Sequence, residues 1–310
     1  MGYSRFSGLP PLHIIEESYL QTFSHSLRSI ILFSIPSFLF YTVFIIVSTF
    51  STIKYSFTDF SGIGKANFVG MENYKRLLTD EIFIKSCSNT IIILIVSFLL
   101  ILPISFFLAY VLDWNFKGSS AVKALNFTPY IIAPVIVATI WVFLLDPTMG
   151  VINNALKIVG LEKLQQEWIG GNTKTPYSIG VVYAWQSIGY YATIFLAGLK
   201  TVPTEIYEAS SIEGANAWQK LRYITLPMIK DSIVIVIVLA VNGALKIFEL
   251  VYQMTNGGPN HKSETAVTYM YYIMFKSGKY SYGSAMAVVV LVACMIFTLI
   301  YIRNVKDNLE

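Results

Sequence analysis

Four polar residues recur along a segment that is otherwise apolar. Asn242, Lys246, Glu249 and Gln253 stand at i, i+4, i+7 and i+11, a spacing that places them on one stripe of a helix. Charged side chains inside a long apolar segment usually face a cavity or one another. The stripe therefore predicts a pathway for a polar solute, with Asn242 as the better solute contact. The alternative is an ion pair between Lys246 and Glu249 that serves only the structure.

A second apolar segment carries hydroxyl, amide and aromatic groups together. Tyr183, Ser187 and Tyr190 share one helical face, and Gln186 lies beside them. A pocket for a small polar solute combines apolar or aromatic walls with a few placed polar groups. These four residues are therefore candidate solute contacts. Helix packing or anchoring at the membrane interface, which explains most membrane Tyr and Trp, is the alternative.

The sequence offers little for metal binding or catalysis. His13, His25 and His261 stand apart, and no grouping of Cys, His, Asp and Glu has metal-ligand spacing, so we predict no metal site. Cys87 and Cys294 lie before and within apolar runs and are expected to be free, small apolar residues. A membrane-embedded enzyme would need a clustered catalytic set at one depth. We therefore expect no catalytic residue in this chain.

A nucleotide-binding loop is also missing. A P-loop requires G-x-x-x-x-G-K-[ST], but neither Gly-Lys pair, at 64–65 or 278–279, is followed by Ser or Thr. We therefore expect no cofactor on this chain. If ATP drives its function, ATP and Mg²⁺ bind to a partner.

The composition is that of a chain solvated by lipid. Of the 310 residues, 55% are hydrophobic and 13% charged, against about 25% charged residues in soluble proteins. The mean hydropathy is +0.60, which excludes disorder and argues against a soluble enzyme. The net charge of +4 is small and not clustered, so no nucleic-acid partner is expected.

Six apolar runs are long enough to cross a membrane, which takes about 20 residues. We predict an all-α membrane protein with six transmembrane helices in one domain, 30–303, between an N-terminal segment, 1–29, and a tail, 304–310. The runs are Ile30–Ile53, Asn89–Leu112, Asn126–Leu145, Ile179–Leu199, Met228–Tyr252 and Gly283–Arg303. The even number places both ends on one side. Lys and Arg are shared almost evenly between the two sides, so charge does not decide which side that is.

The connection at 200–227 reads as a short, bent helical element. Pro203 suits a first helical turn, and Glu205 and Glu208 follow near the helix N-terminus, where the macrodipole favours anions. Gly214 is expected to break the helix, and Pro227 to stop a second stretch and open the next span. By periodicity alone, an ordinary amphipathic helix at the membrane surface is the alternative.

The same connection carries a motif. E-A-S-x-x-E-G-A at Glu208–Ala215, followed by I-T-L-P at 224–227, resembles the EAA loop of ABC importer permeases, usually E-A-A-x-x-D-G-A and then I-x-L-P. Ser210 and Glu213 depart from that form but keep size or charge. The resemblance implies that a cytosolic ATPase docks on this loop, and the residues it assigns to that contact are Glu208, Ala209, Ser210, Glu213, Gly214, Ala215, Leu226 and Pro227.

Further segments match in the same order. Phe68–Phe83, Asp146–Leu156 and Met254–Asn260 resemble carbohydrate-uptake permeases related to the large maltose transporter subunit, so the likeness covers about 30–303. It implies a bacterial inner-membrane protein with the EAA loop and both ends in the cytosol. The implied partners are a second homologous permease, two copies of an ABC ATPase, an external binding protein that delivers a sugar or oligosaccharide, and the lipid bilayer. Alternating access is the implied mechanism.

Two other transporters remain as alternatives. One is an ABC permease for a non-sugar solute, which the EAA motif alone allows. The other is a secondary transporter, which more often shows broken helices or inverted repeats; we expect neither here. The sequence does not say which sugar is carried.

Overall fold

The computed structural model describes residues 31–114, 116–171 and 173–306, with side chains as far as residue 303. The predicted N-terminal segment, 1–29, lies outside the described residues, as do residues 307–310 of the predicted tail. The chain divides into two compact units, Met1–Lys54 and Tyr55–Glu310, and each is described by itself. Within the described ranges the elements are helices, and the one β-bridge joins Thr58 to Phe68.

The first unit holds one long apolar helix. It runs from Ile31 and continues into the second unit to end at Ser56, through a π-helical stretch, η1 (Thr42–Val47), and α2 (Ser48–Ser56). The first predicted span is therefore confirmed, with an extra turn at its end. Hydroxyls inside it donate to the carbonyls four residues earlier, which satisfies them where water is scarce.

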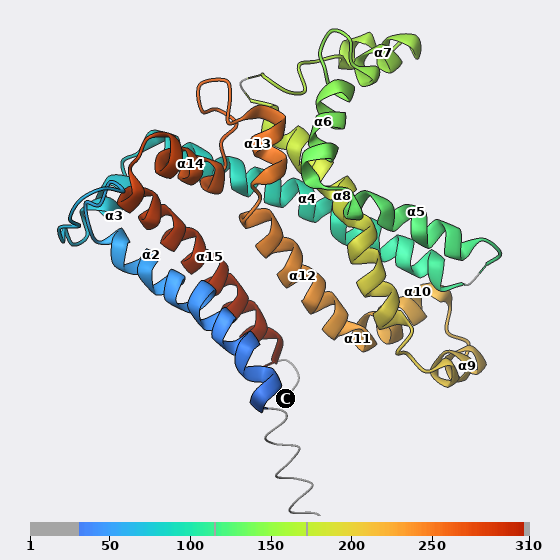
Figure 1. Ribbon diagram of the computed structural model, residues 1–310. Helices are drawn as coiled ribbons and strands as arrows, with labels where there is room; N and C mark the ends of the chain where they lie inside the picture. Colours follow the sequence, from blue (N-terminus) through green and yellow to red (C-terminus); the bar gives the residue numbers. More distant parts are fainter. Residues whose placement is uncertain (1–30, 115, 172, 307–310) are drawn as a thin grey trace, which may run out of the picture. The chain divides into compact units, whose positions relative to one another are not determined.

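The second unit opens with a short helix, α3 (Glu72–Leu77), and the long helix α4 (Glu81–Asp113) (Figure 1). The helix α4 begins eight residues before the predicted Asn89, because the Asp80 carboxylate accepts hydrogen bonds from the amides of Ile82 and Phe83. Such an N-cap satisfies donors that the first turn leaves free. The apolar run predicts the part within lipid, and the cap determines where the helix starts.

The predicted third span is not one helix, so our expectation of unbroken helices is wrong here. Its residues form α5 (Ser119–Ile131) and α6 (Pro134–Leu144), which meet at 94°. Ile132 and Ala133 are extended because a proline disfavours the helical conformation of the residue before it. The same proline suits the first turn of α6.

The predicted fourth span is the continuous helix α8 (Thr175–Leu199). It packs against α4, α5 and α12 (Lys230–Leu245). The helix α8 carries buried polar side chains, among them Gln186 and Ser187. Gly189 permits the closest crossing: a side chain there would overlap the backbone carbonyl of Asn126 on α5.

The predicted fifth span is interrupted, and the sixth is continuous. The helix α12 ends at Leu245, and α13 (Glu249–Thr255) resumes after a gap at 246–248. The helix α15 (Tyr280–Lys306) contains the sixth predicted span. Between them lie α14 (Ala266–Tyr271) and a π-helical turn, η4 (Tyr272–Lys276).

By length and apolar composition, the described part of the chain holds four spanning helices, or five if α5 and α6 count as one. The four are Ile31–Ser56, Glu81–Asp113, Lys230–Thr255 and Tyr280–Arg303. The predicted fourth span, α8, is long but is not among these four. The all-α membrane fold is therefore confirmed, while the count of six spanning helices stays a prediction.

Candidate coupling loop and solute pathway

The connection from α8 to α12 is a hairpin of short helices, which we name the coupling loop (200–227). Its first helix is α9 (Thr204–Ile212), with Pro203 directly before it. Gly214 has φ +82°, a conformation that glycine adopts without strain. This turn lets the amide of Ala215 donate to the carbonyl of Ser210 at 2.9 Å, which closes the end of α9 in the manner of a Schellman motif.

The second arm starts at α10 (Ala217–Lys220), where Asn216 and Gln219 form a reciprocal capping box. A π-helical turn, η3 (Leu221–Thr225), and α11 (Leu226–Met228) follow without a stop. The predicted stop at Pro227 is therefore wrong, and the interruption lies at Ile229. The wider π turn relieves the clash between the proline ring and the carbonyl four residues earlier.

Side chains tie the two arms together. The Tyr207 hydroxyl lies 3.0 Å from Oγ1 of Thr225, and Lys220 Nζ donates to Ser211 Oγ at 2.6 Å. Thr225 is 1% exposed, so the bond from Tyr207 reaches the core of the loop. At the start of the loop, Lys200 forms an ion pair of 2.7 Å with Asp113 at the end of α4.

The outer face of the loop is open and partly apolar. Ile212, Trp218 and Tyr223 are 88%, 66% and 70% exposed, and exposed apolar patches of this kind mark interaction sites. Among the eight residues of the motif, five are exposed (Glu208, Ala209, Glu213, Gly214 and Pro227), two are half-buried (Ala215 and Leu226), and Ser210 is buried. An open hollow of about 400 Å³ lies over the motif residues 210 and 213–215.

The candidate pathway residues of α8 occupy two environments. Tyr190 stacks on Tyr130 of α5, with ring centroids 4.3 Å apart and an angle of 9°. The hydroxyl of Tyr183 lies against Gly243 of α12, with the hydroxyl of Tyr191 nearby, and Ser187 is buried one turn further along α8. The structure thus brings Tyr183 beside the residue that follows Asn242.

Asn242 joins α12 to α15. Its Nδ2 donates to the carbonyl of Val238 at 2.8 Å and to Oγ1 of Thr298 at 3.0 Å. An amide nitrogen has two hydrogens, so both are used. Only the carbonyl oxygen of Asn242 is left to contact a solute, as an acceptor.

Gln186 faces the bend after α5, one turn before Tyr190, which also faces α5. It is 6% exposed, and its Nε2 donates at 3.2 Å to the carbonyl of Ile132, which the bend between α5 and α6 frees. At the gap after α12, Thr265 Oγ1 likewise donates a hydrogen bond to the Ile247 carbonyl, at 3.2 Å. Membrane helices tolerate breaks where neighbours satisfy the freed groups, so this contact gives Gln186 a structural role.

The polar stripe is not continuous. The gap at 246–248 rotates Glu249 and Gln253 off the register of α12. Lys246 and Glu249 are both exposed, and they form no ion pair within 4.0 Å among the described residues. The prediction of one stripe on one helix is therefore wrong beyond Lys246, because the loop that carries Thr265 packs into the gap.

Sequence reasoning missed an anchor between α4 and the segment before α14. Asn89 is fully buried, and its Nδ2 donates to the carbonyls of Lys262 and Glu264 at 2.8 and 2.9 Å. Thr90 accepts from the amide of Ala266 at 3.0 Å. The signal in the sequence that could have predicted this anchor is the adjacent pair Asn89 and Thr90 at the start of an apolar run.

Asp80 forms a second anchor at the same end of α4. Its carboxylate accepts from the hydroxyls of Tyr282 and Tyr269 at 2.7 and 3.1 Å. Partial burial raises the pKa of Asp80, but hydrogen bonds from Tyr282, the amide of Phe83 and Tyr269 outweigh it, and the pKa lies below its ordinary value. These bonds stabilise the charged form.

Comparison with known proteins identifies the class. Residues 101–306 match the family described as binding-protein-dependent transport system inner membrane components. The chain belongs to this family, and it is a multi-pass permease of an ABC importer.

Two relatives and one solved structure are similar over most of their length. A probable ABC transporter permease of Pyrococcus horikoshii is 32% identical over 280 residues, which cover 90% of this chain and 96% of that protein. The trehalose/maltose permease MalF of Thermococcus litoralis is 30% identical over 264 residues, 84% of this chain and 88% of that one. A bacterial ABC transporter involved in the import of the acidic polysaccharide alginate shares the fold, with a TM-score of 0.79 at 22% identity over 93% of this chain and 99% of that chain.

Proposed function

We propose that this chain is one of two homologous permease subunits of an ATP-driven importer for a sugar or oligosaccharide. Two copies of a cytosolic ATPase bind ATP and Mg²⁺ below it, and an external binding protein delivers the solute. The family description names a binding-protein-dependent system. The sugar class is supported by the relatives, whose names concern trehalose, maltose and alginate. This chain then performs no chemistry, and its termini lie in the cytosol.

The observation that carries the proposal is the coupling loop. A helical path runs from α10 through α11 and is interrupted only at Ile229 before α12. An ATPase that moves the exposed face of the loop would therefore move α12, which carries Asn242. In alternating access, ATP binding would close the ATPases and open the cavity outward, and hydrolysis would reset it.

The solute pathway in this proposal runs along the side of α8 that meets α5 and α12. Tyr190 supplies an aromatic face, Tyr183 and Ser187 supply hydroxyls, and Asn242 supplies an acceptor oxygen. Lys246 and Glu249, exposed at the gap after α12, are the charged groups at the external end of this path. An aromatic platform with few polar groups suits a saccharide.

The test is uptake of labelled saccharides by the complete transporter in liposomes, with ATP inside and binding protein outside. Gly214→Glu is expected to abolish uptake, because a charged side chain would stand where the loop must approach the ATPase. The matched control is Gly160→Glu, since both glycines have positive φ, +82° and +76°, and open space around the missing side chain. Normal uptake by Gly214→Glu would refute docking at this loop, and uptake without ATP would favour a secondary carrier.

A further inference from the structure

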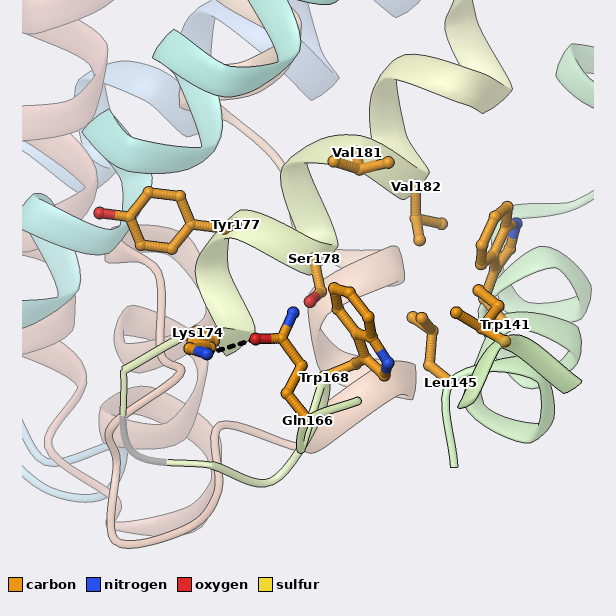
Figure 2. A pocket seen from close by; sticks show the side chains of 10 residues that line it. Trp141, Leu145, Gln166, Trp168, Lys174, Tyr177, Ser178, Val181 and Val182 are labelled. Carbon is orange, nitrogen blue, oxygen red and sulfur yellow. Dashed lines mark hydrogen bonds between the residues drawn. The ribbon is translucent and has the colours of Figure 1, made fainter. Parts of the chain in front are cut away.

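An apolar pocket lies at the end of α8 opposite the coupling loop (Figure 2). Its volume is about 520 Å³, within the range of ligand sites. Trp141 of α6 and Leu145, directly after that helix, form one wall, and Trp168 lies across from α8. From α8 come Tyr177 and Val181, which are 51% and 44% exposed, so the pocket opens at the surface of this chain.

Two of the polar groups around the pocket are engaged, whereas Nε1 of Trp141 is buried without a hydrogen-bond partner among the described residues. Trp168 Nε1 donates to Oδ1 of Asn153 at 2.8 Å, and Lys174 Nζ donates to Oε1 of Gln166. The surface that faces the pocket is almost entirely carbon. A saccharide would find few hydrogen-bond partners there, whereas an alkyl chain needs none.

The depth of the pocket suits a lipid. The helix α8 has 25 residues, a length of about 37 Å, which matches a bilayer with part of its interfaces. Val182, which lines the pocket, is eight residues into α8, so the pocket lies within about 12 Å of that end. Trp, Tyr and Lys are the residues that gather at this level of a membrane.

Lys174 gives the pocket a charged rim. It is exposed, and the partner it shows is the neutral side chain of Gln166. The described ion pairs do not include it. A cation at the mouth of an apolar pocket complements a phosphate attached to an alkyl chain.

We propose that this pocket binds one acyl chain of an outer-leaflet glycerophospholipid, with the phosphate beside Lys174. The assignment to the outer leaflet rests on the proposed function, which places the coupling loop in the cytosol. The pocket lies on the face of α8 that carries Tyr177 and Val181, whereas Tyr183, Ser187 and Tyr190 point elsewhere. The lipid would therefore hold α6 against α8 beside the solute path without entering it.

The test uses the complete transporter in nanodiscs made with phosphatidylglycerol that carries bromine on its acyl chains. Bromine quenches tryptophans that it touches, and the difference between the native chain and Trp168→Phe isolates the signal of Trp168. We expect strong quenching of Trp168. Lys174→Glu is expected to raise the mole fraction of brominated lipid needed for half-maximal quenching of Trp168 by about fivefold. Lys163→Glu, at an exposed lysine of the same connection, is expected to leave this mole fraction unchanged.

A second pair of variants tests the pocket rather than the charge. Val181→Phe fills the mouth and is expected to reduce the quenching of Trp168, whereas Val135→Phe, at an exposed position in the first turn of α6, is not. Absence of quenching in the native complex would mean that protein covers the pocket, and would overturn the proposal. Equal quenching in Lys174→Glu and the native chain would mean that Trp168 only contacts bulk lipid, and this would also overturn the proposal.

The outcome is separable from the proposed function. Uptake driven by ATP with no quenching of Trp168 would refute the lipid site alone. Quenching without any ATP-driven uptake would refute the importer and leave the site. Bromolipid confined to one leaflet of a liposome shows which side the pocket faces.

Discussion

The hydroxyl of Tyr207 lies 3.0 Å from Oγ1 of Thr225, and this bond joins α9 to the helical path that leads into α12. Thr225 is buried and also bonds the carbonyl of Lys220 at 3.3 Å, so it lies in the π turn itself. Single π turns inside helices are frequent at functional sites. The bond thus fixes the angle between the coupling helix and the spanning helix at the point where the path could bend.

Tyr207→Phe is expected to lower the amount of solute moved per ATP hydrolysed. A net hydrogen bond contributes about 1 kcal/mol, roughly fivefold in a coupling equilibrium, so we expect a loss of that order with ATPase activity retained. The control is Ser211→Ala, which removes the exposed bond from Lys220 on the same loop. An unchanged ratio of transport to hydrolysis in Tyr207→Phe would show that the bond does not transmit motion.

Tyr190→Phe separates solute contact from packing. The substitution keeps the ring that stacks on Tyr130 and removes only the hydroxyl. If Tyr190 contacts the solute, we expect KM for uptake to rise several-fold with an unchanged melting temperature, because one polar contact contributes about 1 kcal/mol. Tyr130→Phe, on the other side of the stack, is the control. An equal effect of both variants, or none, would assign the stack to helix packing.

Gln186→Leu tests whether this residue serves the bend or the solute. It leaves the Ile132 carbonyl at the bend without its donor, which costs about 1 kcal/mol. We expect a lower melting temperature in detergent and an unchanged KM for the protein that remains folded. Gln253→Leu, which removes an exposed contact of 3.5 Å with Thr139, should change stability little. A raised KM at normal stability would return Gln186 to the solute pathway.

The lowered pKa of Asp80 predicts that the folded chain loses stability at low pH. The pKa of Asp80 is lower in the folded chain than in the unfolded chain. Its charged carboxylate therefore stabilises the fold above the ordinary pKa of about 3.9, and this stabilisation is lost as pH falls through the pKa of the folded chain. Asp80→Asn keeps the cap but not the charge. We expect it to be less stable by about 1 kcal/mol near pH 7, with the difference narrowing below about pH 4.

The measurement is thermal unfolding of the purified complex in detergent at several pH values. Glu81→Gln, next to Asp80 in the first turn of α4, is the control for removing one negative charge. A stability difference between Asp80→Asn and the native chain that stays constant from pH 7 to pH 3 would contradict the assignment.

Local sequence determined the features that depend on nearest neighbours. The apolar runs predicted the helices from Ile31, in α4 and in α15, because lipid or core contact needs only a continuous apolar stretch. Gly214 predicted the break after α9, since the turn needs a residue that tolerates positive φ. The motif at Glu208–Ala215 identified the family before any contact was known.

Tertiary structure decided what each buried polar group does. Gln186 had the composition of a solute ligand, but the bend at Ile132 lies 54 residues away in the chain and takes its amide. The stripe from Asn242 to Gln253 had perfect helical spacing, but Thr265 and its loop occupy the gap that interrupts it. A polar side chain in a membrane core bonds whichever carbonyl a distant helix break leaves free, and spacing along one segment carries no information about where another segment breaks.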